Sequence, residues 1–108
     1  MRLLLDECVP ARLGRALPSH QVSTVVQEGW SGIKNGMLLA LAAGRFDALI
    51  TVDKTLPYQQ NTRNLPLAVV VLDAASNELH CLLPILPVLE LALATLEPCS
   101  YSLLRAEA

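Results

Sequence analysis

Residues 48–53 spell ALITVD, an uninterrupted apolar run that ends in an aspartate. Two other stretches repeat this pattern, LLLD at residues 3–6 and LAVVVLD at residues 67–73. Apolar runs of this length without alternating polar residues are typical of strands that are covered on both faces, as in parallel sheets. The three runs therefore predict a buried parallel sheet in which each of these strands ends in an aspartate.

The segments between these runs complete a repeating order of strands and helices. Further strands are expected at residues 21–26 and 99–104, the second of them at an edge of the sheet. A loop is expected at residues 28–34. Helices are expected at residues 10–17, 35–43, 55–61 and 76–96, the last one capped by Ser76 and bent at Pro84 and Pro87. This alternation predicts an α/β fold with helices on both faces of the sheet.

The composition indicates one domain with more apolar residues than its core requires, so that some of them lie on the surface. The chain has 108 residues, of which 53% are hydrophobic and only 17% are charged, against about 25% charged in a typical globular domain. We therefore expect one domain over residues 1–108 and a homodimer or a tight partner complex. The net charge of −2 excludes a generally basic surface, so any nucleic acid must be bound locally.

Cysteine usage and hydropathy favour a cytoplasmic protein. The three cysteines form no CxxC pair, and no secretory signal precedes the first acids. The most apolar stretch, residues 82–96, contains two prolines and Glu90. It is shorter than the roughly 20 residues that span a bilayer, so we expect no membrane segment.

The aspartates that end the apolar runs form the candidate site. The carboxyl ends of parallel strands lie at one edge of a sheet, about 4.8 Å apart between neighbours. Carboxylate oxygens without His or Cys favour a hard cation, Mg²⁺ or Mn²⁺, which can activate water for attack at phosphorus. Asp47 precedes its strand and is expected at the opposite edge. The candidate metal ligands are Asp6, Glu7, Asp53 and Asp73, with Asp6 and Asp53 as the catalytic pair.

Two of these roles have local alternatives, and several further residues are candidate substrate contacts. Asp73 lies just before an expected helix, so a capping role is the alternative for it. Arg12 and Arg15 are additional cations that could reach a phosphate, although a solvated surface is the alternative for all such residues. The candidate substrate-binding residues are Lys34, Asn35, Lys54, Gln60, Asn61 and Arg63.

Four ordered blocks resemble the small bacterial PIN-like family of the PIN nuclease superfamily. They are LLLDECVP, GIKNGMLLALA, DALITVDKTLPYQQN and LAVVVLDA, which together cover nearly the whole chain. The resemblance implies a three-layer α/β/α sandwich with a mainly parallel sheet of about five strands. It also implies a metal-dependent ribonuclease, similar to VapC-like toxins, that uses Mg²⁺ or Mn²⁺, forms a homodimer and pairs with a small antitoxin-like protein.

The resemblance carries over to the acids only in part. Asp6 matches the acid that ends the first strand, Glu7 completes its Asp-Glu pair, and Asp53 matches the acid of the T-x-D block. Relatives carry another acid in the first turn after KNG, where this chain has Met37. The first alternative is therefore a PIN-like module that binds a protein or RNA without cleaving it. The second is a receiver-like phosphoacceptor domain, with Glu7 and Asp53 as its acids.

Overall fold

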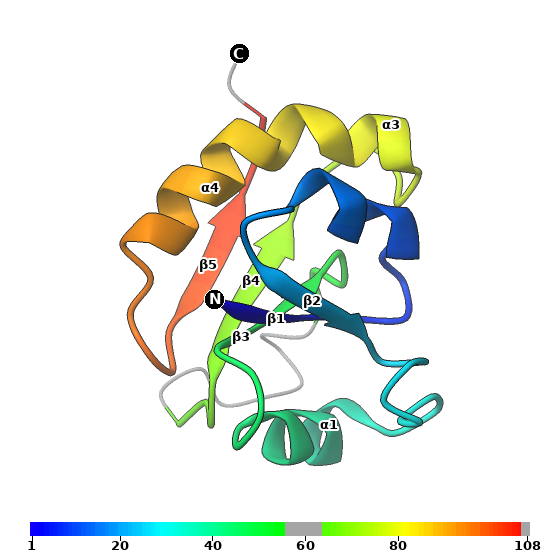
Figure 1. Cartoon of the computed structure of the whole chain (residues 1–108), viewed down its shortest axis with the longest axis vertical. Helices are drawn as coiled ribbons and strands as arrows, with labels where there is room; N and C mark the ends of the chain where they lie inside the picture. The colour runs from blue at the N-terminus through cyan, green and yellow to red at the C-terminus, as the bar shows by residue number, and fades with distance from the viewer. Residues whose placement is uncertain (56–63, 107–108) are drawn as a thin grey trace.

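The fold is a five-stranded parallel sheet with helices packed on it, as seen in a computed structural model that describes residues 1–55 and 64–106 (Figure 1). The strand order is β2-β1-β3-β4-β5, and every neighbouring pair is parallel. The strands are β1 (Arg2–Leu5), β2 (Gln21–Thr24), β3 (Ala48–Thr51), β4 (Ala68–Leu72) and β5 (Tyr101–Leu104). The prediction of an α/β fold with a mainly parallel sheet is confirmed.

The order in which strands are added to the sheet reverses at β1. From β1 it passes to β2 on one side, and it then returns to place β3 on the other side. Leu5 consequently lies between Thr24 of β2 and Ile50 of β3 in the register. In open parallel sheets, ligands bind outside the carboxyl ends of the strands at such a switch point. The topology therefore draws attention to the ends of β1 and β3.

Both faces of the sheet are covered, which explains the uninterrupted aliphatic runs. Successive side chains of a strand point to opposite faces, so Leu3 and Leu5 belong to one core cluster whereas Leu4 belongs to the other. The first face packs against η1 (Ala11–Ala16), α3 (Leu79–Leu82), η2 (Leu83–Ile85) and α4 (Leu86–Ala94), and the second against α1 (Asn35–Ala42) (Figure 1). Hydrophobic burial on both sides makes β3 and β4 the most protected part of the sheet.

Two of the expected helices differ from the prediction, one in its type and one in its extent. The helix expected at residues 10–17 is a 3₁₀ helix. The helix expected at residues 76–96 begins only at Leu79 and is divided into three pieces, in which the two prolines occupy first-turn positions that need no N–H. Ser76 does not cap that helix, because its hydroxyl instead accepts the N–H of Glu78 in the preceding turn, 3.1 Å away.

Two strand boundaries each differ from the prediction by two residues. Strand β2 ends at Thr24, two residues early, where the chain turns towards Gln27. Strand β5 begins at Tyr101 because Cys99 has a φ of 58°, which is incompatible with an extended strand. Its edge position agrees with the prediction. The helix expected at residues 55–61 falls almost entirely outside the described residues. Within residues 1–55 and 64–106, no helix has the length and apolar character needed to cross a bilayer.

Candidate functional site

The carboxyl ends of β1 and β3 are joined by one buried hydroxyl, that of Thr51. Asp6 follows β1, and its N–H donates to the Ile50 carbonyl at 2.9 Å, which extends the pairing of the two strands by one residue. The Thr51 hydroxyl donates to Asp6 Oδ2 at 2.8 Å and accepts the N–H of Asp53 at 3.1 Å. Thr51 is fully buried. The two acids that the sequence places 47 positions apart are thus held by a shared side chain.

Asp6 and Asp53 are held by hydrogen bonds rather than by ion pairs in the described part of the chain. Within the described part of the chain, no lysine or arginine forms an ion pair with either carboxylate. Asp6 Oδ1 accepts the N–H of Glu7 at 2.9 Å, and Asp53 Oδ1 accepts the N–H and the hydroxyl of Thr55 at 2.9 and 2.6 Å. Both aspartates are half-buried. Two partly desolvated carboxylates at a switch point are suited to holding a cation.

Cys8 completes the hydrogen-bond network around Thr51. Its Sγ lies 3.4 Å from Thr51 Oγ1 and 3.6 Å from Asp6 Oδ2. Burial raises the pKa of the Cys8 thiol, and the Thr51 hydroxyl opposes this shift only in part. The thiol is therefore protonated at neutral pH and serves as a weak hydrogen-bond donor rather than as a nucleophile.

Sequence reasoning missed Thr51, although a signal for it was present. The T-x-D spacing puts the hydroxyl two residues before Asp53, and residues i and i+2 of a strand lie on the same face. A buried threonine at that position requires a hydrogen-bond partner at the strand end. The spacing alone could not identify Asp6 as that partner, because the pairing depends on which strand lies beside β3.

Both carboxylate oxygens of Glu7 bind the loop that precedes α1. Its Oε2 accepts the Ser31 hydroxyl at 2.8 Å, and its Oε1 accepts the Gly32 N–H at 2.7 Å. Gly32 has a φ of +81°, a conformation that favours glycine. The Gly32 N–H, followed by the Ser31 hydroxyl, lowers the pKa of Glu7 below its ordinary value. Both oxygens of this candidate metal ligand are therefore engaged by the loop.

Trp30, which precedes Ser31 in the loop that Glu7 binds, is held in place by aromatic contacts. The rings of Trp30 and Phe46 meet edge to face, with centroids 6.1 Å apart, and the Arg45 guanidinium lies 5.6 Å from the centroid of the Trp30 ring. Arg45 also pairs with Glu28 at 2.9 Å. The position of Trp30 consequently reports on whether the loop is in place.

We expect Glu7→Gln to lower stability at neutral pH and to shift Trp30 fluorescence. Because the folded-state pKa of Glu7 is depressed, its stabilising contribution is complete above the ordinary value of 4.5 and is lost as the pH falls through the lower folded value. The urea midpoints of wild type and Glu7→Gln should therefore differ at pH 7 and converge towards pH 3. A difference that persists unchanged at pH 3 would show that the carboxylate charge is irrelevant to the loop.

Asp73 lies at the same edge of the sheet but is already bound by two cations. Lys54 Nζ approaches its Oδ1 at 2.5 Å, and Arg105 Nε donates to its Oδ2 at 2.6 Å. These two partners, Lys54 first, lower the pKa of Asp73. Its N–H donates to the Leu104 carbonyl at 2.8 Å, so the residue links the ends of β4 and β5. Arg105, which sequence reasoning missed, adds a cation to this edge.

The structure also places two of the remaining candidate substrate contacts and the excluded Asp47. Lys34 and Asn35 stand at the start of α1, directly after the loop that Glu7 holds. Asp47 lies at the opposite edge as expected, where its Oδ2 accepts the N–H of Arg2 at 2.7 Å. The candidate substrate contacts Gln60, Asn61 and Arg63 lie outside the described residues.

Within residues 1–55 and 64–106, no three His, Cys, Asp or Glu side chains converge as a metal cluster. Comparison of the chain with protein-family models, with curated proteins and with solved structures gives no match.

Proposed function

We propose that the protein is a PIN-like, metal-dependent ribonuclease with its active site at the carboxyl ends of β1 and β3. The observation that carries this proposal is the shared Thr51 hydroxyl, which contacts Asp6 Oδ2 at 2.8 Å and the N–H of Asp53 at 3.1 Å. The proposed architecture is a three-layer α/β/α sandwich, supported by the two core clusters on opposite faces of the sheet. A toxin role with a small antitoxin-like partner, and a homodimeric state, belong to the same proposal.

The donor set fits a hard divalent cation that retains most of its water ligands. Asp6 and Asp53 supply only oxygen atoms, and Asp53 Oδ2 has no partner among the described residues. Mg²⁺ is commonly held by one or two carboxylates plus waters and substrate phosphate, so a site without a third acid is sufficient. When bound, Mg²⁺ or Mn²⁺ would supply Lewis-acid activation of water at a phosphodiester.

In this proposal, separate residues bind the cation, position its ligand and attract the RNA. Asp6 and Asp53 hold the cation, and Thr51 positions the Asp6 carboxylate. Lys54 and Arg105 together carry two positive charges against the single charge of Asp73. That excess, beside Asp53, is placed to attract a phosphate of the RNA backbone.

We expect Asp6→Asn and Asp53→Asn each to reduce Mn²⁺-dependent RNA cleavage by at least about 100-fold. Each change removes a negative charge from the proposed cation site with little change in side-chain volume. Cleavage of a mixed-sequence RNA pool is measured by gel electrophoresis across a Mn²⁺ titration, and Mn²⁺ affinity is measured in parallel by calorimetry.

The matched control is Asp47→Asn, which makes the same chemical change at the opposite edge of the sheet. This variant should retain cleavage within about threefold of wild type, as expected for a residue far from the reacting groups. The nuclease proposal fails if wild type leaves the RNA intact at every Mn²⁺ concentration. It fails equally if the three variants behave alike.

A non-catalytic binding module is the second candidate, and the surface of α1 favours it. Met37, at the position where the resemblance to the PIN-like family implies an acid, is 66% exposed, and Leu41 on the same helix is 40% exposed. Exposed apolar side chains at neighbouring positions of one helix are typical of partner surfaces. RNA that is bound but not cut at saturating Mn²⁺ would favour this function.

A receiver-like phosphoacceptor is the third candidate, because receiver domains share the strand order 2-1-3-4-5. A receiver has a hydroxyl residue after the fourth strand, where this chain has Asp73, and a lysine after the fifth, where it has Arg105. In addition, both carboxylate oxygens of Glu7 are bound by Ser31 and Gly32. Phosphorylation of Asp53 by a small phosphodonor in Mg²⁺ would select this candidate.

A further inference from the structure

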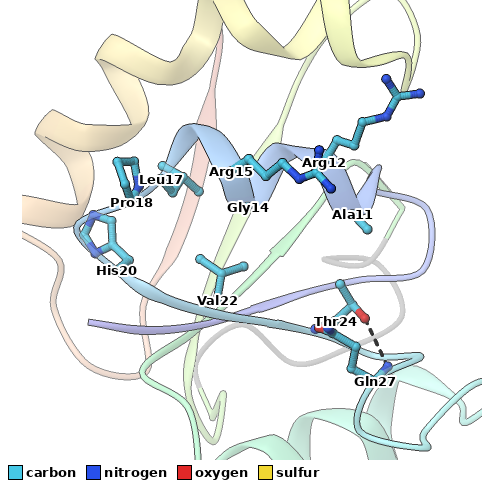
Figure 2. A pocket seen from close by; sticks show the side chains of 10 residues that line it. All are labelled: Ala11, Arg12, Gly14, Arg15, Leu17, Pro18, His20, Val22, Thr24 and Gln27. Atoms are coloured by element: carbon cyan, nitrogen blue, oxygen red, sulfur yellow. Dashed lines mark hydrogen bonds between the residues drawn. The ribbon is translucent and has the colours of Figure 1, made fainter.

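A cavity of about 420 Å³ lies along the edge of the sheet, between η1 and β2 (Figure 2). It is separate from the proposed active site, since neither Asp6 nor Asp53 lines it. Its volume falls within the range of sites that bind small molecules. Pro18 and Val22 supply apolar surface to its wall, and Gly14 lets η1 approach β2 closely.

The polar lining of the cavity is entirely cationic or neutral. Arg12 and Arg15 are three residues apart on a 3₁₀ helix, which has three residues per turn, so both side chains leave the same face of η1. Both are exposed, and neither has an ion-pair or hydrogen-bond partner among residues 1–55 and 64–106. The cavity lining includes no Asp or Glu. Two uncompensated guanidinium groups stand out on a chain whose net charge is −2.

His20 also lines the cavity, and its ring is held in place by Glu90. Its Nε2 lies 3.2 Å from both carboxylate oxygens of Glu90, so Nε2 carries a proton. Its Nδ1 is buried and has no hydrogen-bond partner among the described residues. In the neutral ring this atom is an acceptor, but its burial puts it out of reach of a ligand in the cavity.

The cavity is better suited to a compact anion than to an added β-strand. Gln21 and Val25 direct their N–H groups to β1, so the alternate residues Val22 and Thr24 direct theirs to the open edge. The outward groups of Thr24 are already occupied, its N–H by the Gln27 side chain at 2.9 Å and its carbonyl by the Glu28 N–H at 3.1 Å. Figure 2 shows Gln27 folded against Thr24 at this end of the cavity. The edge is therefore closed to a pairing peptide beyond Val22.

We infer that the cavity between η1 and β2 binds the phosphate group of a nucleotide through Arg12 and Arg15. The guanidinium groups provide paired donors for phosphate oxygens. The apolar side chains of Pro18 and Val22 provide a surface for the nucleoside. The phosphate belongs either to a free mononucleotide or to the backbone of an RNA chain. This inference does not depend on the proposed ribonuclease.

The test uses adenosine 5′-monophosphate, adenosine, and a short RNA that lacks terminal phosphates, each titrated into the 108-residue chain in EDTA. EDTA removes any divalent cation, so binding at the Asp6–Asp53 site does not contribute. Affinity is measured by calorimetry, and the amide resonances of Val22 and Gln27 are followed by NMR. The monophosphate or the RNA should bind and shift these resonances, and adenosine should bind at least about tenfold more weakly.

Two double variants separate the role of the cavity arginines from that of other arginines near β2. Arg12→Gln/Arg15→Gln should weaken binding by about tenfold or more. Arg2→Gln/Arg45→Gln is the matched control, because these arginines line a second hollow beside β2 but are paired with Asp47 and Glu28. It should bind within about twofold of wild type, the usual extent for substitutions away from a site. Circular dichroism verifies that both variants are folded.

Each result has a definite reading. Binding of the monophosphate alone identifies a free nucleotide as the source of the phosphate, and binding of the RNA alone identifies its backbone. The inference is overturned if neither ligand binds at millimolar concentration or if adenosine binds as tightly as its monophosphate. Equal losses in the two double variants would also overturn it, since they would indicate non-specific attraction.

Discussion

Replacing Leu49 by alanine should lower the free energy of unfolding by about 2–5 kcal/mol, the range for large-to-small changes in a packed core. Leu49 is fully buried in the central strand β3, where it belongs to the core cluster beneath α1. The substitution leaves a cavity that β1 and β4, fixed on either side of it, cannot close. Urea unfolding followed by circular dichroism measures the change.

Leu91→Ala is the matched control for this substitution. Leu91 lies on α4 with 67% of its surface exposed, so the same truncation should change the free energy of unfolding by less than about 0.5 kcal/mol. Similar losses in the two variants would contradict the assignment of the core. They would also imply that the face of α4 around Leu91 is covered in solution.

Thr51→Val should reduce stability and, if the ribonuclease proposal holds, activity as well. Valine has nearly the same shape but no hydroxyl, so Asp6 Oδ2 loses its closest donor and the N–H of Asp53 loses its acceptor. Leaving such groups unpaired costs about 1–3 kcal/mol. Loss of the residue that positions a metal-binding carboxylate should lower Mn²⁺ affinity and RNA cleavage by about 10–100-fold.

Thr51→Ser separates these two consequences. Serine retains the hydroxyl but removes a buried methyl group, so stability falls by about 1 kcal/mol whereas Mn²⁺ affinity stays close to that of wild type. The positioning role of Thr51 is refuted if the valine variant binds Mn²⁺ as tightly as the serine variant. Binding is measured by calorimetry at a temperature where both variants are folded.

The buried strands of the fold were predictable from the sequence. The strand ends and the type of one helix were less predictable, because they depend on individual side-chain contacts and backbone angles. The runs that became β1, β3 and β4 are aliphatic throughout because helices cover both faces of the sheet, and a local pattern is enough to detect that. The ends of β2 and β5 were misplaced because they depend on side-chain contacts of Gln27 and on the left-handed φ of Cys99. The 3₁₀ form of η1 was not predicted, since the same residue spacing also fits an α-helix.

The candidate site was predictable only as a set of acids. The sequence placed Asp6, Asp53 and Asp73 after three strands, and the structure shows all three at the carboxyl ends of neighbouring strands. Their different surroundings could not be predicted. Asp73 is neutralised by Lys54 and Arg105, whereas Glu7 is engaged by the loop of Ser31 and Gly32. Such partners come from distant parts of the chain.

The class of the fold and the strand ends at which the acids stand follow from local patterns of residues. Hydrophobic periodicity is a local property, because each residue meets the core or the solvent according to its place in its own element. Two features depend on the three-dimensional packing: β3 lies beside β1, so that Thr51 joins Asp6 to Asp53, and η1 and β2 form an open cavity lined by Arg12 and Arg15. Strand order depends on packing between segments far apart in the chain, which no local pattern encodes.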